Sequence, residues 1–148
     1  MKKFYISPGM IKQLVMKKSK PWVFIIEDDI SIIKAYIAKF KYEKIPLKVA
    51  EDGDKAIEVL KHESLPCVIL LDLMLPKKNG FEVLEIIKKD PRLKEIPVLI
   101  FTNLGQEVDR KKGEQLGVVE YLVKANTKID DVVHKVNRYI KKYGDESG

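Results

Sequence analysis

Five short, almost wholly apolar runs recur along the chain, and each is followed by a longer amphipathic stretch. The runs are Val23–Ile26, Leu47–Ala50, Val68–Leu71, Val98–Phe101 and Tyr121–Val123 with the valines before it. They are too continuously apolar for strands with one face in water, so they indicate a parallel sheet that helices cover on both sides. Parallel neighbours need helical crossovers. The alternation therefore predicts an α/β fold, a doubly wound (βα)5 sandwich with a five-stranded parallel sheet.

The stretches between the runs have the apolar spacing of helices. Apolar residues lie on one face at positions 30, 33, 37 and 40, at 56, 57 and 60, at 81, 84 and 87, and at 129, 132, 133, 136 and 140. Pro91 ends the third predicted helix, and the fifth is expected to run to about Tyr143. The fourth, from Val108 to Leu116, is weaker because Gly113 interrupts it.

This pattern predicts one domain over residues 22–143, preceded by an extension of residues 1–21 and followed by a polar tail, 144–148. In the extension, one face of a short helix is possible, formed by Met10, Ile11, Leu14 and Val15. The alternatives are a mobile tail and a basic amphipathic patch for a partner or a membrane surface. Five residues after Tyr143 leave no room for a DNA-binding domain. Output is therefore expected through a partner, unless the chain is part of a longer protein.

The bulk composition narrows the classes of function. The net charge of +6 raises the possibility of nucleic-acid binding, but the lysines are spread among acidic residues, as on a solvated surface. No apolar stretch reaches the roughly 18 residues that span a bilayer, and the N-terminus lacks the apolar core of a signal peptide. We therefore expect a cytoplasmic protein that binds no membrane. The single cysteine, Cys67, allows no disulfide within the chain and is expected to be a buried thiol.

Polar residues follow four of the five predicted strands. Glu27, Asp28 and Asp29 follow the first, Asp72 the third, Thr102 the fourth and Lys124 the fifth. In open α/β sheets, the carboxyl ends of the strands form the ligand-binding edge. Each residue alone has an ordinary explanation: Asp28 or Asp29 as a helix cap, Thr102 as a turn former, and Lys124 as a solvated charge.

Together, these residues indicate phosphoryl chemistry. Carboxylates that converge at one edge repel each other unless a cation joins them, and Mg²⁺ prefers oxygen ligands and bridges protein acids to phosphates. The Asp72 carboxylate can act as a nucleophile that forms an acyl phosphate. Lys124 can pair with a phosphoryl oxygen, and the Thr102 hydroxyl can donate a further hydrogen bond.

From Val23 to about Tyr143 the sequence resembles the receiver domains of response regulators in two-component signalling. The resemblance rests on four segments, Val23–Asp29, Leu70–Pro76 with Asn79–Glu82, Pro97–Thr102 and Tyr121–Lys124. It implies a flavodoxin-like fold in which Asp72 accepts a phosphoryl group from a histidine kinase or a phosphotransfer protein. It also implies a domain that catalyses only its own phosphorylation and dephosphorylation, and that is a monomer or a weak homodimer.

The resemblance further assigns roles to single residues. It implies that Glu27, Asp28, Asp72 and the main-chain carbonyl of Met74 bind the magnesium ion. It also implies that Thr102 moves inward on phosphorylation and that Tyr121 follows, which switches a surface formed by the fourth helix, the fifth strand and the fifth helix. Without the resemblance, Tyr121 is an ordinary half-buried strand aromatic.

Two residues depart from the family pattern. Ala125 stands where the family usually has a proline, often after a cis bond, and a cis bond before alanine costs about 3–4 kcal/mol. We predict a trans bond and a displaced Lys124 loop. Asn103 replaces a smaller residue beside the phosphorylation pocket. With the apolar Met74 nearby, Asn103 predicts slow self-dephosphorylation, because it narrows the access of water.

Three rival interpretations remain at the level of sequence. The first is a degenerate receiver that binds a partner without phosphorylation, against which the intact acids, Thr102 and Lys124 argue. The second is an aspartyl-phosphate hydrolase of the haloacid dehalogenase type, which needs an acid two residues after the nucleophile, where Met74 stands. The third is a basic adaptor for nucleic acid, whose affinity would fall steeply with salt.

Overall fold

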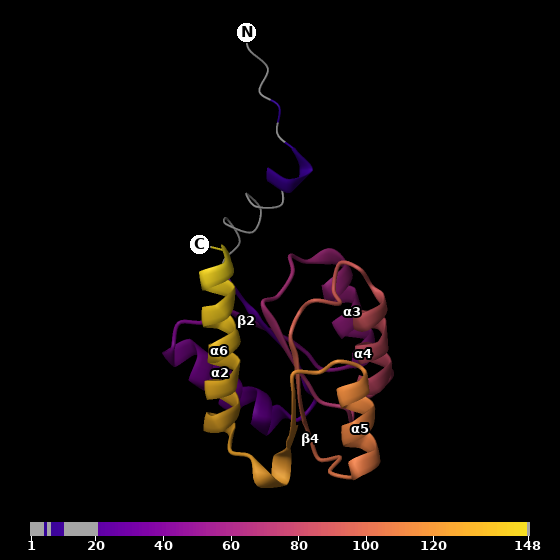
Figure 1. The fold of residues 1–148 in the computed structure, drawn as a ribbon. Coiled ribbons are helices and arrows are strands. Elements are labelled where there is room, and N and C mark those ends of the chain that lie inside the picture. The colour runs from indigo at the N-terminus through magenta and orange to yellow at the C-terminus, as the bar shows by residue number, and fades with distance from the viewer. Residues whose placement is uncertain (1–4, 6, 11–20, 148) are drawn as a thin grey trace.

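The structure, a computed structural model, describes residues 5, 7–10 and 21–147 (Figure 1). Most of the predicted N-terminal extension, including Ile11, Leu14 and Val15, therefore lies outside the described residues. From residue 22 on, strands and helices alternate. They are β1 (Val23–Ile26), α2 (Ile30–Tyr42), β2 (Leu47–Ala50), α3 (Gly53–His62), β3 (Val68–Leu71), α4 (Gly80–Lys89), β4 (Val98–Thr102), α5 (Glu107–Gln115), β5 (Glu120–Val123), the 3₁₀ turn η1 (Lys124–Asn126) and α6 (Ile129–Ser147).

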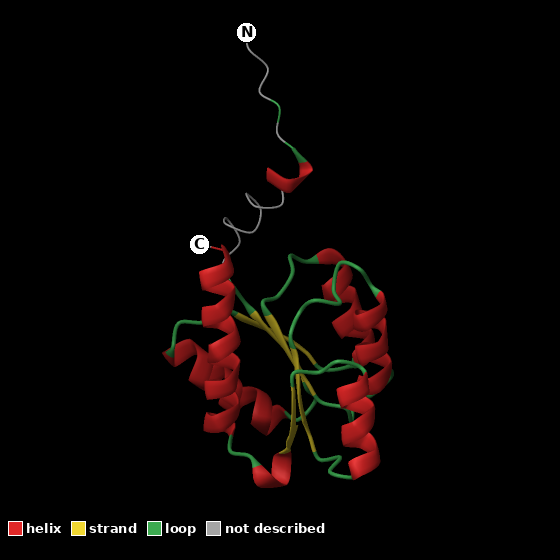
Figure 2. Cartoon of the chain, viewed as in Figure 1, coloured by secondary structure: helices red, strands yellow, loops and turns green. Residues whose placement is uncertain are grey.

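The five strands form one parallel sheet in the order β2-β1-β3-β4-β5. Helices α2 and α6 cover one face of the sheet, and α3, α4 and α5 cover the other (Figure 2). The predicted doubly wound, flavodoxin-like α/β fold is therefore confirmed. The strand order reverses between β1 and β3, and this reversal is where such sheets bind their ligands.

Two apolar clusters hold these layers together, one on each face of the sheet. Because successive side chains of a strand point to opposite faces, Phe24 and Ile26 pack toward α3 and α4, whereas Val23 and Ile25 pack toward α2 and α6. Every residue of β1, β3 and β4 is buried. The continuous apolar runs thus reflect burial on both faces, as expected from the sequence.

Most element boundaries agree with the sequence pattern. Side chains that accept main-chain N–H groups begin three helices, at Asp29 for α2, Asp52 for α3 and Asn79 for α4. The predicted start of the fifth strand is wrong, because β5 begins at Glu120 and the two valines before it lie outside the strand.

The predicted end of the last helix is wrong, because α6 continues beyond Tyr143 to Ser147 and takes in most of the expected polar tail. Gly144 weakens a helix by only about 1 kcal/mol, and no proline follows to stop it. Among the helices of the described residues, none is both long enough and apolar enough to cross a membrane.

Candidate functional site

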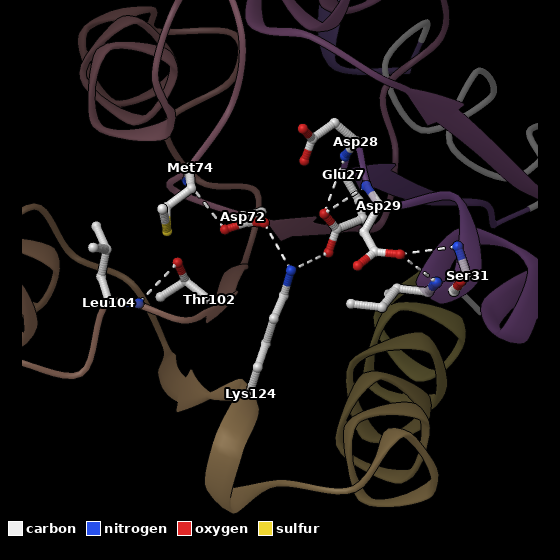
Figure 3. Close-up of polar contacts among 10 residues, drawn as sticks. Glu27, Asp28, Asp29, Ser31, Asp72, Met74, Thr102, Leu104 and Lys124 are labelled. Atoms are coloured by element: carbon white, nitrogen blue, oxygen red, sulfur yellow. Dashed lines mark hydrogen bonds and ion pairs between the residues drawn. The ribbon is translucent and has the colours of Figure 1, made fainter.

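Three acids come together at the reversal point of the sheet. Strands β1 and β3 pair in register, with Ile26 beside Leu71, so the residues that follow the two strands are neighbours. One carboxylate oxygen from each of Glu27, Asp28 and Asp72 lies within 4.8 Å of the others. Figure 3 shows Glu27 and Asp72 around the end of the Lys124 side chain. These residues were predicted from the sequence to share one edge of the sheet.

Glu27 is a buried carboxylate with several donors. Its Oε2 atom accepts hydrogen bonds from the main-chain N–H groups of Asp28 (3.0 Å) and Asp29 (3.2 Å), and its Oε1 atom lies 2.7 Å from Lys124 Nζ. Burial raises the pKa of Glu27, the hydrogen bond to Lys124 opposes this and the charge of Asp72 adds to it, so that the pKa lies at about 7. A cation beside Glu27 would favour its ionised form.

Asp72 is fixed on both sides of its carboxylate. Its Oδ2 atom accepts a hydrogen bond from Lys124 Nζ at 2.8 Å, and its Oδ1 atom accepts one from the main-chain N–H of Met74 at 3.1 Å. The first turn of α4 approaches this position closely, since a Cβ atom on Gly80 would lie 2.4 Å from the Asp72 carbonyl oxygen. Only glycine fits at that point.

Lys124 lies between the two buried acids and has little contact with water. Burial alone would lower the pKa of its ammonium, but the hydrogen bonds to Asp72 and Glu27 outweigh that effect and raise it. The described residues contain no cis peptide bond, so the predicted trans bond between Lys124 and Ala125 is confirmed. The displacement of the loop stays a prediction.

The charge of this cluster fits a divalent cation. The three carboxylates carry three negative charges when ionised, and the Lys124 ammonium compensates one of them. The two that remain match one Mg²⁺ ion, which takes carboxylate and carbonyl oxygens and keeps several waters. Asp28 is exposed, so the cluster is open to solvent on that side. The role of the Met74 carbonyl as a ligand stays a prediction.

Asp29 is separate from the cluster; the residue types alone left either Asp28 or Asp29 as the helix cap, and the resemblance placed Asp28 among the metal ligands. Its Oδ1 atom accepts hydrogen bonds from the main-chain N–H groups of Ser31 (2.9 Å) and Ile32 (3.2 Å). Asp29 therefore caps α2 and leaves Asp28 as the exposed acid of the site (Figure 3).

Thr102 and Tyr121 lie on the neighbouring strands β4 and β5 and meet through one loop residue. The main-chain N–H of Leu104 lies 3.4 Å from the Thr102 hydroxyl oxygen, and the Leu104 carbonyl accepts a hydrogen bond from the Tyr121 hydroxyl at 2.6 Å. Thr102 is fully buried, and Tyr121 is 7% exposed. Tyr121 is therefore turned inward in this structure.

Three residues around Tyr121 were not predicted from the sequence to contribute to the site. Leu104 connects Thr102 to Tyr121 through its main chain, and the Arg110 guanidinium lies 5.1 Å from the centre of the Tyr121 ring. A Cβ atom on Gly113 would lie 3.1 Å from that ring, so the absence of a side chain at Gly113 makes room for it. A glycine inside a helical pattern was the one available signal.

A protein-family model described as the response regulator receiver domain matches residues 23–137. The chain belongs to this family. Membership excludes the hydrolase interpretation and makes the chain a receiver domain of two-component signalling.

Two curated relatives show how far the similarity extends. A probable transcriptional regulator ycf27 of Guillardia theta is 34% identical over 107 residues, which are 72% of this chain and 41% of the relative. The DNA-binding dual master transcriptional regulator RpaA of a Synechocystis strain is 38% identical over 104 residues, 70% of this chain and 43% of RpaA. The chain thus matches well under half of each regulator's length.

Solved receiver structures agree with the observed fold. The receiver domain of the Francisella response regulator 1452 is 30% identical, with a TM-score of 0.74 over 82% of this chain and 98% of that one. The Mn²⁺-bound form of the response regulator Rcp1 is 34% identical, with a TM-score of 0.68 over 78% of this chain and 89% of that one. Rcp1 is thus a relative that was crystallised with a divalent ion.

Proposed function

We propose that this receiver accepts a phosphoryl group on Asp72 from a phosphohistidine of a kinase or a phosphotransfer protein, in a reaction that requires Mg²⁺. The observation that supports this proposal most strongly is the arrangement around Asp72. Lys124 Nζ lies 2.8 Å from Asp72 Oδ2 and 2.7 Å from Glu27 Oε1, and one carboxylate oxygen from each of Glu27, Asp28 and Asp72 lies within 4.8 Å of the others. The nucleophile Asp72 thus has one fixed cation beside it, the Lys124 ammonium, and a place for a second cation among the carboxylates.

The chemistry of this step follows from the groups in place. An Asp72 carboxylate oxygen forms a bond to phosphorus as the bond from phosphorus to the donor's imidazole nitrogen breaks, and the imidazole takes up a proton. The Lys124 ammonium pairs with an oxygen of the transferred group, and the Thr102 hydroxyl donates to another. Transfer of this kind depends on positioning and charge compensation, which these fixed side chains provide.

Glu27, Asp28 and Asp72 would hold the magnesium ion, with the Met74 carbonyl as a fourth protein ligand. The bound ion would neutralise charge between the acids and the incoming phosphoryl group. Because Glu27 and Asp72 are buried and Asp28 is exposed, Asp28 would be the ligand that faces an ion arriving from solvent.

The response to phosphorylation would pass from Thr102 to Tyr121. A phosphoryl group that attracts the Thr102 hydroxyl draws it away from the Leu104 N–H, whose hydrogen bond at 3.4 Å is already long. Leu104 also binds the Tyr121 hydroxyl, so its movement changes the support of the ring. The surface of α5, β5 and α6 would then differ between the two states and would bind a downstream protein.

We further propose that the chain has no catalytic activity beyond its own phosphorylation and dephosphorylation. Its nucleophile ends the reaction as an acyl phosphate, and hydrolysis of that bond returns the free carboxylate. The cytoplasm as its location and the monomer or weak homodimer as its state stay predictions.

A small phosphodonor with Mg²⁺, followed by intact mass, tests the proposal. Wild type should gain one phosphoryl group, and Asp72→Asn should gain none, because an amide cannot form the acyl phosphate. Asp29→Asn is the matched control, since asparagine also caps a helix, and it should be phosphorylated like wild type. Phosphorylation of Asp72→Asn, or equal phosphorylation with and without Mg²⁺, would contradict the proposal.

A further inference from the structure

Tyr36 on α2 has a buried hydroxyl group without a hydrogen-bond partner. The residue is 1% exposed, and within the described part of the chain only one other buried side-chain atom, Asn137 Oδ1, also has no partner. The Asn137 amide nitrogen at least donates to Glu43. For Tyr36 the hydroxyl is the only polar atom of the side chain, and all of its hydrogen-bonding capacity is unmet.

This hydroxyl lies beneath the acidic cluster. A narrow internal space is lined by Tyr36 together with Glu27, Asp72, Phe101 and the adjoining residues of β1 and β3, and it has no room for a water molecule. The Tyr36 ring meets the Phe101 ring edge-on at 6.3 Å, and Phe101 in turn lies 5.8 Å from Lys124 Nζ. Tyr36 therefore belongs to the core and lines the same internal space as the two buried acids.

A phenylalanine at this position would fill the same apolar surroundings without burying a polar group. Leaving a buried hydroxyl unpaired costs free energy, so the tyrosine is unfavourable in the state described here. Buried polar groups are almost always paired, so an exception needs an explanation, and a partner in another state of the site is one.

The chemistry of the site supplies such a state. Glu27 Oε1 has Lys124 Nζ at 2.7 Å, while Glu27 Oε2 has two main-chain donors. When the ammonium turns toward a phosphoryl oxygen, Oε1 loses its donor and stays buried. Burial, with the charges of Glu27 and then Asp72, raises the pKa of the Tyr36 hydroxyl well above its usual range. The group therefore stays protonated and able to donate.

We propose that Tyr36 is a positioning residue whose hydroxyl donates to the Glu27 carboxylate once the site holds a cation and a phosphoryl group. It replaces the hydrogen bond that Lys124 gives up and keeps Glu27 oriented toward the metal. This inference rests on the proposed function, because it requires Lys124 to move to a phosphoryl oxygen.

The experiment compares wild type with Tyr36→Phe, which removes one oxygen atom and keeps the ring. Two quantities are measured: the free energy of unfolding in urea without Mg²⁺, and the affinity for beryllium fluoride with Mg²⁺ by calorimetry, as a phosphoryl mimic. Tyr36→Phe should be at least as stable as wild type, and it should bind the mimic about three- to tenfold more weakly, the range for one lost hydrogen bond. Tyr139→Phe, a half-buried tyrosine of α6 away from the acids, should bind it like wild type.

The two measurements separate a positioning role from a structural one. Equal affinity of wild type and Tyr36→Phe would overturn the proposal, whether or not the stability changed. The mass experiment on Asp72 distinguishes this failure from failure of the proposed function. If wild type is phosphorylated and Tyr36→Phe binds the mimic as tightly as wild type does, only the role of Tyr36 is overturned. If wild type takes up neither a phosphoryl group nor the mimic, the proposed function and the role of Tyr36 are both overturned.

Discussion

The two halves of the site differ in the forces that hold them. The pocket where β1 and β3 end contains four ionisable side chains, and Lys124 Nζ lies 2.7 Å from Glu27 and 2.8 Å from Asp72. The pair of strands β4 and β5 presents two neutral hydroxyl groups, on Thr102 and Tyr121, joined through the main chain of Leu104. The first half is held by ion pairs between buried charges, and the second mainly by packing and neutral hydrogen bonds, with the Arg110 guanidinium against the Tyr121 ring.

This difference assigns separate tasks to the two halves. A buried charge responds strongly to any added or lost charge, because the protein interior screens it weakly. Neutral hydrogen bonds contribute only about 0.5–1.5 kcal/mol each, so they exchange at little cost. The acidic half is therefore suited to detect a phosphoryl group, and the neutral half is suited to change conformation in response.

The largest expected effect comes from removing the cation of the acidic half. Lys124→Met leaves Glu27 and Asp72 buried without their shared partner, which should lower the free energy of unfolding by about 3–5 kcal/mol. Urea unfolding without Mg²⁺ measures this loss. Added Mg²⁺ should restore part of it, since a metal ion can replace the missing positive charge.

Lys135→Met is the matched control for that variant. Lys135 pairs with Glu120 at 3.4 Å, and both side chains are about 30% exposed, at 29% and 31%. Removing this pair should cost less than about 1 kcal/mol. Equal losses for the two variants would show that charge does not dominate the acidic half.

A smaller effect is expected in the neutral half. Tyr121→Phe removes the hydrogen bond to the Leu104 carbonyl and keeps the ring against Gly113, so the free energy of unfolding should fall by about 1 kcal/mol. Calorimetric Mg²⁺ affinity should stay unchanged, because the tyrosine does not touch the acids. A change in Mg²⁺ affinity as large as the change in stability would remove the separation between the halves.

The smallest effect concerns Asn103, an exposed residue directly after Thr102 and thus at the border of the two halves. If its side chain restricts the approach of water to the acyl phosphate, Asn103→Ala should shorten the half-life of the phosphorylated form by about threefold, which is less than 1 kcal/mol in the barrier. Intact mass followed over time after removal of the phosphodonor gives the half-life. An unchanged half-life would count against slow self-dephosphorylation through Asn103.

The sequence predicted the acidic half well and the neutral half only in part. Glu27, Asp72 and Lys124 could be predicted because parallel strands bring their carboxyl ends to one edge, whatever the details of the loops. The contact of Lys124 with Glu27 was not predicted, because the sequence analysis paired the lysine with the phosphoryl group alone. Which of Asp28 and Asp29 caps α2 depends on main-chain geometry that composition does not encode.

Main-chain contacts explain most of what was missed in the neutral half. Leu104 acts through its N–H and carbonyl groups, which every residue carries, so no sequence signal identifies it. In the sequence, Gly113 indicated only a less stable helix. The structure shows that the absence of a side chain at Gly113 leaves space for the Tyr121 ring. The end of α6 was missed because Gly144 is a poor stop signal without a proline after it.

The composition of α5 has a consequence for local unfolding. Gln106 makes no side-chain cap, and the only buried residue of the helix is Gly113, whereas α4 has the Asn79 cap and four buried residues. Few buried contacts mean that α5 opens at a lower free energy than the sheet, on the scale that amide hydrogen exchange measures. Helix α5, which is proposed to carry the signal, is thus held less strongly than α4. A partner that binds α5 would stabilise the helix through contacts that its own residues do not make.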